Sequence, residues 1–182
     1  MVELLAALSA SAAAGIRSAL PLLVIGLLQG DKLWSGVPLL SGISPPVVLG
    51  VLTSCSLVEL FASKNLLGQR VLQLIQLVFS PIVGGIMGIT VVQISDPPTA
   101  FIWIIGVVGS LFALVLQLIQ VSWFYRLRGL PLWVVFIQDA LCIALVILAF
   151  DAPLPGGLVA LILLWLAVRS SNNWYRSHSR QR

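Results

Sequence analysis

Six stretches of this chain consist almost entirely of apolar or small residues, and short segments rich in proline, glycine or charge separate them. A run of about 20 apolar residues forms a helix that is long enough to cross a bilayer. The pattern therefore predicts an all-α, polytopic integral membrane protein with about six transmembrane helices. Their expected bounds are 2–29, 45–63, 71–94, 100–122, 131–150 and 153–169.

Composition supports this class and bounds the domain organisation. Apolar residues make up 59% and charged residues 9% of the 182 residues, whereas charged residues form about a quarter of an ordinary soluble domain. The mean hydropathy is +1.09. Spans of about 20 residues leave room only for short loops, which excludes a soluble catalytic domain within these residues. We expect one transmembrane domain over residues 1–169 and a basic tail over residues 170–182.

Two features set the first apolar segment apart. Gly15 and Pro21 lie inside it, and it is long enough to tilt in the membrane or to break near these residues. Its SASAAA run resembles the cleavage site of a signal peptide, but no basic residue precedes the apolar run and Glu3 is acidic. We therefore expect a retained first helix.

Basic residues alternate between the two sides of the predicted spans. With the N-terminus inside, the outer loops hold only Lys32, while the inner loops and tail hold Lys64, Arg70, Arg126, Arg128, Arg169, Arg176, Arg180 and Arg182. Because lysine and arginine are retained on the cytoplasmic side, this bias predicts that both termini are cytoplasmic. Trp174 and Tyr175 fit a tail that lies against anionic lipid headgroups, and we favour this over nucleic-acid binding.

Three charged residues, Arg17, Glu59 and Asp139, lie inside apolar stretches. A guanidinium at bilayer depth costs roughly 3 kcal/mol or more, so Arg17 needs a partner or water. Glu59 and Asp139 are its candidate partners. A bidentate Arg17–Glu59 pair is geometrically reasonable, while Asp139 has no obvious structural partner within a turn. Two interpretations stay open. The pair fixes helix packing, or Arg17 binds an anionic group while Glu59 or Asp139 carries protons.

Small and polar residues recur at helical spacings, which indicates helix faces turned toward other helices. The third segment carries Gln69, Gln73, Gln76, Ser80, Gly84 and Gly88, and the fourth carries Gly106, Ser110, Ala113, Gln117 and Gln120. Glycine and alanine at such spacings form close-packing seams, and the Gly106 and Ser110 face is a candidate seam between copies of the chain. Hydrocarbon cannot satisfy glutamine amides, so the polar positions predict a hydrated pathway. Its expected residues are Gln73, Gln76, Ser80 and Gln117.

Two segments contain a proline followed by paired glycines. Pro81-x-x-Gly84-Gly85 lies in the third segment, where the lost ladder hydrogen bond at Pro81 predicts a kink or an opening. Pro153-x-x-Gly156-Gly157 begins the short sixth segment, where a tilted or partly re-entrant element is expected. Three spans separate the two patterns, as in a 3+3 inverted repeat with broken helices near Pro81 and Pro153. No other motif aligns at the same offset.

Several of these motifs, taken in order, resemble one family. They are Ala14-Gly15-Ile16-Arg17-Ser18-Ala19-Leu20-Pro21, Glu59 with Lys64, Pro81-x-x-Gly84, and Gln138-Asp139. Together they are similar to a bacterial membrane-protein family known only as a domain of unknown function, number 4126. The resemblance implies a compact helical membrane protein and supplies no activity. Ser63 and Gln138 stand where the family pattern has acids, which disfavours a mechanism that needs a second carboxylate at either place.

Nothing in the sequence indicates an enzyme. His178, the single histidine, lies in the tail, so no serine or cysteine in the spans has a histidine base. Cys55 with Glu59, and Asp139 with Cys142, share helix faces, but without histidine they do not form a metal site. Both cysteines are expected to be buried small side chains without a disulfide. No phosphate-binding glycine loop is present. We therefore expect no catalytic residues, no metal and no cofactor.

The charges suggest two functions from different classes. The first is a small secondary transporter or channel-like protein for a small solute, with anionic solutes favoured by Arg17 and with Glu59 and Asp139 as a charge relay. The alternative is a non-transporting structural or assembly factor that packs against membrane complexes or lipids. A chain of this size would surround a pathway as a homo-oligomer. The expected location is the bacterial cytoplasmic membrane.

Overall fold

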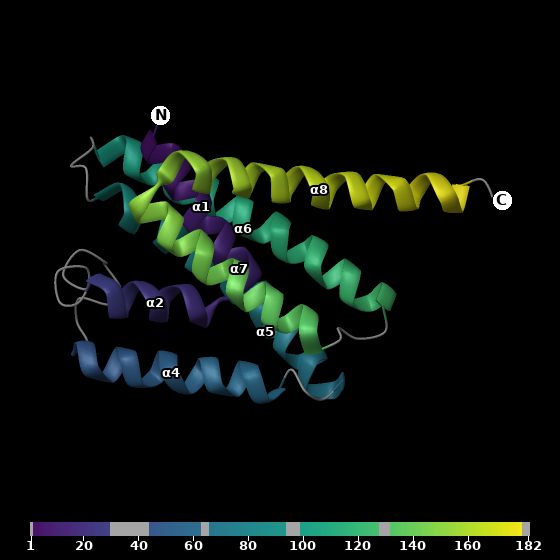
Figure 1. The fold of residues 1–182 in the computed structure, drawn as a ribbon, viewed down its shortest axis with the longest axis horizontal. Helices are drawn as coiled ribbons and strands as arrows, with labels where there is room; N and C mark the ends of the chain where they lie inside the picture. The colour runs from purple at the N-terminus through teal and green to yellow at the C-terminus, as the bar shows by residue number, and fades with distance from the viewer. Residues whose placement is uncertain (1, 30–43, 63–65, 94–98, 128–131, 180–182) are drawn as a thin grey trace.

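The structure is a computed structural model that describes residues 2–29, 44–62, 66–93, 99–127 and 132–179 (Figure 1). Within these residues it contains seven helices and no strand, so the predicted all-α class is confirmed. The helices are α1 (Val2–Ile16), α2 (Ala19–Gln29), α4 (Pro45–Ala62), α5 (Leu66–Gln93), α6 (Thr99–Leu127), α7 (Leu132–Asp151) and α8 (Pro153–Ser179).

The bundle has the surface of a membrane protein. Among the described residues, three segments are long and apolar enough to cross a membrane, namely Gly68–Gln93, Phe101–Phe124 and Trp133–Asp151. Val2–Ile16, Pro46–Glu59 and Pro153–Arg169 are shorter apolar helices. Large hydrophobic side chains such as Val78, Trp103 and Ile162 lie exposed on the outside. A soluble protein rarely exposes apolar surface on this scale, whereas lipid accommodates it.

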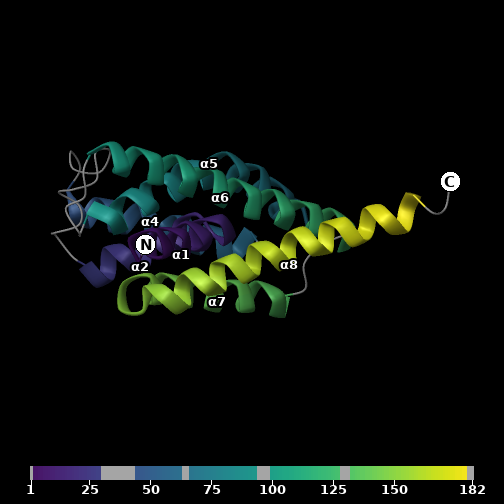
Figure 2. The ribbon, with the colours of Figure 1, turned by 90° about the horizontal axis from the view of Figure 1, so that it is seen from above.

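Helix α1 lies at the centre of the bundle. It contacts α5, α6, α7 and α8, and Figure 2 shows it between the α5–α6 pair and the α7–α8 pair. Every residue from Ala6 to Ile16 is buried. Most of these residues are alanine, serine or glycine, and small side chains let neighbouring helices approach closely.

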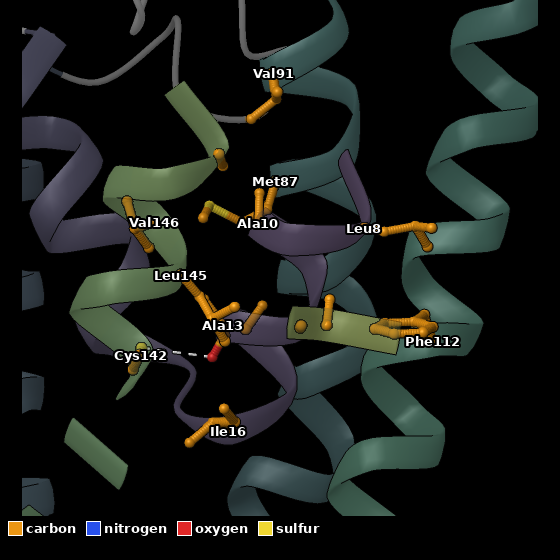
Figure 3. Close-up of a cluster of buried hydrophobic side chains, with 14 of the residues drawn as sticks. Leu8, Ala10, Ala13, Ile16, Met87, Val91, Phe112, Cys142, Leu145 and Val146 are labelled. Atoms are coloured by element: carbon orange, nitrogen blue, oxygen red, sulfur yellow. Dashed lines mark hydrogen bonds between the residues drawn. The ribbon is translucent and has the colours of Figure 1, made fainter. Parts of the chain in front are cut away.

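The core around α1 combines small apolar side chains with serine hydroxyls. Ala10 and Ala13 pack among Met87, Phe112 and Leu145 (Figure 3). The Oγ of Ser9 donates to the carbonyl of Leu145 at 2.8 Å, and the Oγ of Ser11 donates to the carbonyl of Gly84 at 2.9 Å. At Gly84 an added Cβ would collide with the side chain of Ala113 on α6. The hydroxyls of Ser9 and Ser11 therefore find hydrogen-bond acceptors because the helices lie close together. The tight contact with α6 confirms a packing seam at Gly84.

Helices α1 and α2 do not form one crossing helix. The start of α1 lies beside the end of α5 and the start of α6, because Ala7 packs with Val92 and Ile105. The end of α1 lies further along the bundle, where Gly15 meets Ala113 and Leu116 of α6. The helix then breaks at residues 17 and 18, between the two residues that predicted a break.

Helix α2 returns toward the end of the bundle from which α1 came. The Oγ of Ser18 donates to Glu59 near the end of α4, while Leu22 lies with Leu52 and Cys55 along the same groove. Helix α2 therefore runs antiparallel to α4 and ends beside the start of α4 (Figure 1). Helices α1 and α2 therefore form a re-entrant pair whose tip is the break between them.

This pair changes the predicted topology. With 15 residues, α1 is only about 22 Å long, which is less than the roughly 30 Å of a bilayer core. Helices α4 to α8 run along the bundle in alternating directions, so the start of α1 and the end of α8 lie at opposite ends (Figure 1). The structure thus divides residues 2–29 into two antiparallel helices in place of the single predicted span. The cytoplasmic location of both termini stays a prediction.

Other local predictions also need correction. Helix α5 continues without a break through Pro81, whereas the chain is interrupted at Ala152, next to Pro153, as predicted for that segment. The two proline–glycine segments are therefore not equivalent breaks, and the inverted repeat gains no support from them. Cys142 is buried as expected, but Cys55 is exposed. Helix α8 extends ten residues beyond the predicted sixth segment, from 169 to Ser179.

The proposed seam between copies of the chain is occupied within one chain. An added Cβ at Gly106 would collide with Ile89 of α5, and an added Cβ at Gly85 would lie 3.5 Å from the Cβ of Ser110. These positions hold α5 against α6 and border a surface groove between them. A homo-oligomer stays a prediction, without this seam to support it.

The re-entrant pair predicts opposite faces for the two ends of the described chain. In a Cys55→Ser background, a membrane-impermeant thiol reagent should label Glu3→Cys from one face of sealed vesicles and Arg169→Cys only from the other. The background itself should stay unlabelled, because Cys142 is buried. Labelling of both cysteines from the same face would mean that residues 2–29 cross the membrane, and would contradict the hairpin.

Candidate functional site

Arg17 occupies the tip of the re-entrant pair. Its backbone N–H donates to the carbonyl of Ala13 at 3.0 Å and closes the last turn of α1. The residue is 5% exposed, so the guanidinium is buried within the bundle. The C-terminal end of a helix carries a partial negative charge, which favours a cation at this position. The end of α1 therefore positions Arg17, the arginine that was predicted to lie inside the membrane.

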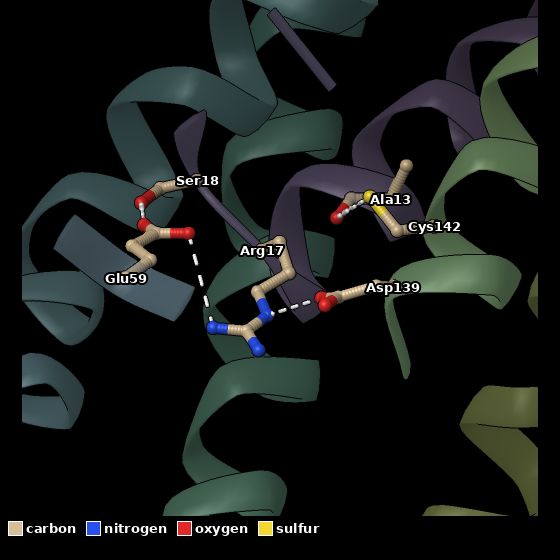
Figure 4. A network of polar contacts seen from close by, with 6 residues as sticks. All are labelled: Ala13, Arg17, Ser18, Glu59, Asp139 and Cys142. Atoms are coloured by element: carbon tan, nitrogen blue, oxygen red, sulfur yellow. Dashed lines mark hydrogen bonds and ion pairs between the residues drawn. The ribbon is translucent and has the colours of Figure 1, made fainter. Parts of the chain in front are cut away.

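The closest partner of Arg17 is Asp139 on α7. The guanidinium Nε donates to Asp139 Oδ1 at 2.8 Å (Figure 4). This length is typical of a charge-assisted hydrogen bond. The side chains of Arg17 and Asp139 are 6% and 14% exposed, respectively. Asp139, one of the two candidate partners of Arg17, is therefore the one that binds it directly, and this partner lies far from Asp139 in the sequence.

Glu59 on α4 is a second, weaker partner. Its Oε2 lies 3.9 Å from Nη1 of Arg17, which is beyond hydrogen-bond distance. Its Oε1 accepts a hydrogen bond of 3.0 Å from the hydroxyl of Ser18. The predicted bidentate Arg17–Glu59 pair is therefore absent, although the two residues do form a distant ion pair. Ser18 belongs to the Ala14–Pro21 motif, but its hydrogen bond to Glu59 was not predicted from the sequence.

The cluster has more acids than bases. Arg17 supplies one positive charge, while Asp139 and Glu59 supply two carboxyl groups around it. With both carboxyls ionised the cluster carries a net negative charge. An anion at Arg17 would have to compete with two carboxylates that are already in place. The geometry therefore disfavours the predicted anionic solute.

A small polar cavity adjoins Arg17. Its volume is about 30 Å³, and it is lined by Arg17, Gln69, Leu72, Gln73, Gln76, Gln120, Val135 and Gln138. This is space for about two water molecules. The glutamines come from three helices, and Gln69 lies near the start of α5. The cavity thus extends from the end of the bundle where α5 begins toward the Arg17 tip.

Two glutamine amides leave atoms unpaired in this region. Among the described residues, Gln73 Oε1 and Gln76 Nε2 are buried and have no hydrogen-bond partner. The two side chains are 8% and 4% exposed. Buried polar atoms of this kind are normally satisfied by protein or by ordered water. The cavity is therefore a place for water or for a small hydrogen-bonding solute.

The other predicted pathway residues lie outside the cavity lining. Ser80 is fully buried, and its hydroxyl lies 3.3 Å and 3.2 Å from the carbonyls of Ala14 and Ala113. Gln117 is 1% exposed, and neither of its amide atoms has a partner among the described residues. Ser80 therefore marks the closed end of the polar stripe, where α1, α5 and α6 pack directly.

The predicted hinge glycines serve mainly as close contacts. Gly156 packs against Ser9, and Gly157 packs against Leu5, so both hold the start of α8 to α1. Pro21 is fully buried inside α2, one turn after the break. Gly15 and Pro21 flank the reversal between α1 and α2, and Gly156 and Gly157 follow the reversal between α7 and α8 at Ala152.

Three lining residues were missing from the predicted pathway, namely Gln69, Gln120 and Gln138. Gln69 and Gln120 continue the stripes of their helices, and Gln138 precedes Asp139 in the sequence. Spacing along each helix therefore contained the signal for the first two. No group of three or more His, Cys, Asp or Glu that could hold a metal occurs in the described part of the chain.

Comparison with known proteins identifies a family but no activity. The family described as Domain of unknown function (DUF4126) matches residues 4–173. No curated protein and no solved structure matches the chain. The resemblance drawn from the Arg17 motif is thereby confirmed.

The distances predict that Arg17 is coupled more strongly to Asp139 than to Glu59. Arg17→Gln and Asp139→Asn should each destabilise the protein by about 3–5 kcal/mol, because each leaves a buried charge without its partner. A double-mutant cycle in detergent should give a coupling energy of about 1–3 kcal/mol for this pair, and a smaller value for Arg17→Gln with Glu59→Gln. Equal coupling to the two acids, or stronger coupling to Glu59, would contradict the geometry.

Proposed function

The chain belongs to this family, whose name assigns no activity, and from the geometry of the site we propose that it is a small secondary transporter or channel-like protein for a small polar solute. The solute would bind in the glutamine-lined cavity next to the Arg17–Asp139 pair. The observation that carries this proposal is the pair of unpaired amide atoms on Gln73 and Gln76.

A purely structural role accounts poorly for these amides. Each buried, unpaired polar group costs about 1–3 kcal/mol, and leucine at the same positions would pack without that cost. Water or a solute in the cavity would satisfy Gln73 Oε1 and Gln76 Nε2. The polar stripe is therefore better explained by a hydrated binding site than by helix packing alone.

The lining favours a neutral or cationic solute over an anion. Glutamine amides offer both donors and acceptors. Among the described residues, Arg17 is the only positive charge that lines the cavity, and it is already flanked by Asp139 and Glu59. A volume of about 30 Å³ holds only water-sized groups, so the described conformation is narrower than a solute-loaded one.

Access from the other end would require α2 and α4 to move. Beyond Arg17, the small residues of α1 pack directly on α5 and α6, as at Gly84 and Gly109. Helix α4 contacts α2 and, less extensively, α5. A shift of α2 together with α4 would carry Ser18 and Glu59 away from Arg17. Alternating access of this kind needs only one mobile pair of helices.

The charges suggest an orientation in the membrane. Arg70 and Arg169 lie toward the end where α5 begins and α8 ends, whereas Glu3 and Asp151 lie at the opposite end. We therefore place the arginine-bearing end in the cytoplasm of a bacterial inner membrane. The guanidinium of Arg169 lies 4.9 Å from the ring centroid of Trp165, an arrangement suited to the lipid headgroup region. In this orientation α1 begins on the outer face.

Flux through liposomes tests the proposal. Wild-type protein should transport at least one member of a panel of small neutral solutes and monovalent cations. Gln73→Leu and Gln76→Leu should lower that flux at least about tenfold at unchanged folded yield, because each removes an amide worth about 1–3 kcal/mol of hydrogen bonding. Gln93→Leu, the same change at the far end of α5, is the matched control and should transport normally.

The outcome also separates transport from the structural alternative. Normal flux in Gln73→Leu and Gln76→Leu would remove the cavity from the mechanism. Undetectable wild-type flux across the whole panel would overturn the transport proposal and favour a structural or assembly factor.

A further inference from the structure

We propose that Glu59 is a proton-binding site, and that a proton taken up there is the coupling ion of the transporter. The first part stands on the geometry of the charge cluster, and the second rests on the proposed function. The proton would come from water and bind at Oε2, which converts the carboxylate into a neutral carboxylic acid. Its release to water would restore the charge.

The two acids around Arg17 are held differently. Asp139 accepts the Nε–H of Arg17 directly at 2.8 Å. Glu59 Oε2 lies 3.9 Å from Nη1, so it accepts no hydrogen bond from the guanidinium there. One guanidinium can balance one carboxylate, and the short contact assigns that role to Asp139. The excess negative charge of the cluster therefore resides on Glu59.

Among the residues that the structure describes, no second cation lies beside Glu59. Its neighbours from α2 and α5 around the adjoining groove include Leu22, Leu72, Ile75 and Phe79, all apolar. Within the described part of the chain, the charged groups that face it are Arg17 at the tip and Asp139 on α7, beyond Arg17. With Glu59 8% exposed, water screens its charge poorly. Protonation removes the uncompensated charge.

Ser18 is suited to both protonation states of Glu59. A hydroxyl can donate one hydrogen bond and accept others. With Glu59 ionised, the Ser18 hydroxyl donates to Oε1, as its 3.0 Å distance allows. With Glu59 protonated, the carbonyl-type oxygen of the acid still accepts the same bond. The site can therefore gain or lose a proton without losing this contact.

Proton binding at Glu59 would also control how strongly Arg17, at the tip of the re-entrant pair, is attracted to α4. Loss of the proton leaves a full negative charge 3.9 Å from Nη1 and draws the guanidinium toward Glu59. Gain of the proton removes that attraction and leaves Arg17 with Asp139 alone. Glu59 is on α4 and Asp139 is on α7. Protonation of Glu59 therefore changes whether Arg17 is attracted to both helices or to α7 alone.

Infrared spectroscopy can detect the proton without a transport assay. The chain contains two glutamates, Glu3 and Glu59, so Glu3→Gln leaves Glu59 as the single one. We expect a carbonyl band of a protonated carboxylic acid that titrates with pH in wild type and in Glu3→Gln. ¹³C-labelled glutamate should shift this band to lower frequency in both. Glu59→Gln should remove it.

The isotope label decides the assignment even if Glu59→Gln fails to fold. A band that shifts with ¹³C-aspartate instead of ¹³C-glutamate would place the proton on an aspartate and overturn the proposal. So would the absence of any protonated-carboxyl band over the pH range in which the protein stays folded. If the wild type transports, a pH gradient should drive its flux and should not drive that of Glu59→Gln. A band without any flux would leave the proton site standing and overturn transport alone.

Discussion

The burial of one guanidinium, that of Arg17, is the constraint on which the rest of the site depends. A charge at this depth needs partners, and Arg17 finds them on α4 and α7, helices far apart in the sequence. The break after α1 allows this, because it lets the chain reverse at Arg17 and run back as α2 beside α4. The same residue thus ends a helix, defines the tip of a hairpin and joins two helices.

The small residues of α1 give the bundle its asymmetry. On one side of Arg17, alanines, serines and glycines bring α5, α6, α7 and α8 close around α1, and serine hydroxyls satisfy the polar groups. On the other side, glutamines from three helices surround a small cavity. A closed, well-packed half and a polar, incompletely satisfied half therefore meet at the charge cluster. In the proposed function, the closed half serves as a gate next to a binding site in the polar half.

Sequence reasoning found the class of fold and the chemistry of the site, but not the pairing. The apolar pattern, the three intramembrane charges and the glutamine stripe of α5 are local signals, and each was readable from spacing. The choice between Asp139 and Glu59 depends on which helices are neighbours, and distances along a helix do not contain that information. Likewise, residues 2–29 are as apolar as a spanning helix, so only the packing of α1 on α6 and of α2 on α4 revealed the reversal.

Cysteine accessibility along α5 tests most directly whether a hydrated cavity ends at Arg17. In a background with Cys55→Ser and Cys142→Ala, Gln69→Cys, Gln73→Cys and Gln76→Cys should react with a small, charged thiol reagent applied to the face that carries Arg70. Ser80→Cys should not react from either face, because Ser80 is fully buried where α1, α5 and α6 pack directly. Unreactive cysteines at 73 and 76, or a reactive one at 80, would contradict the account.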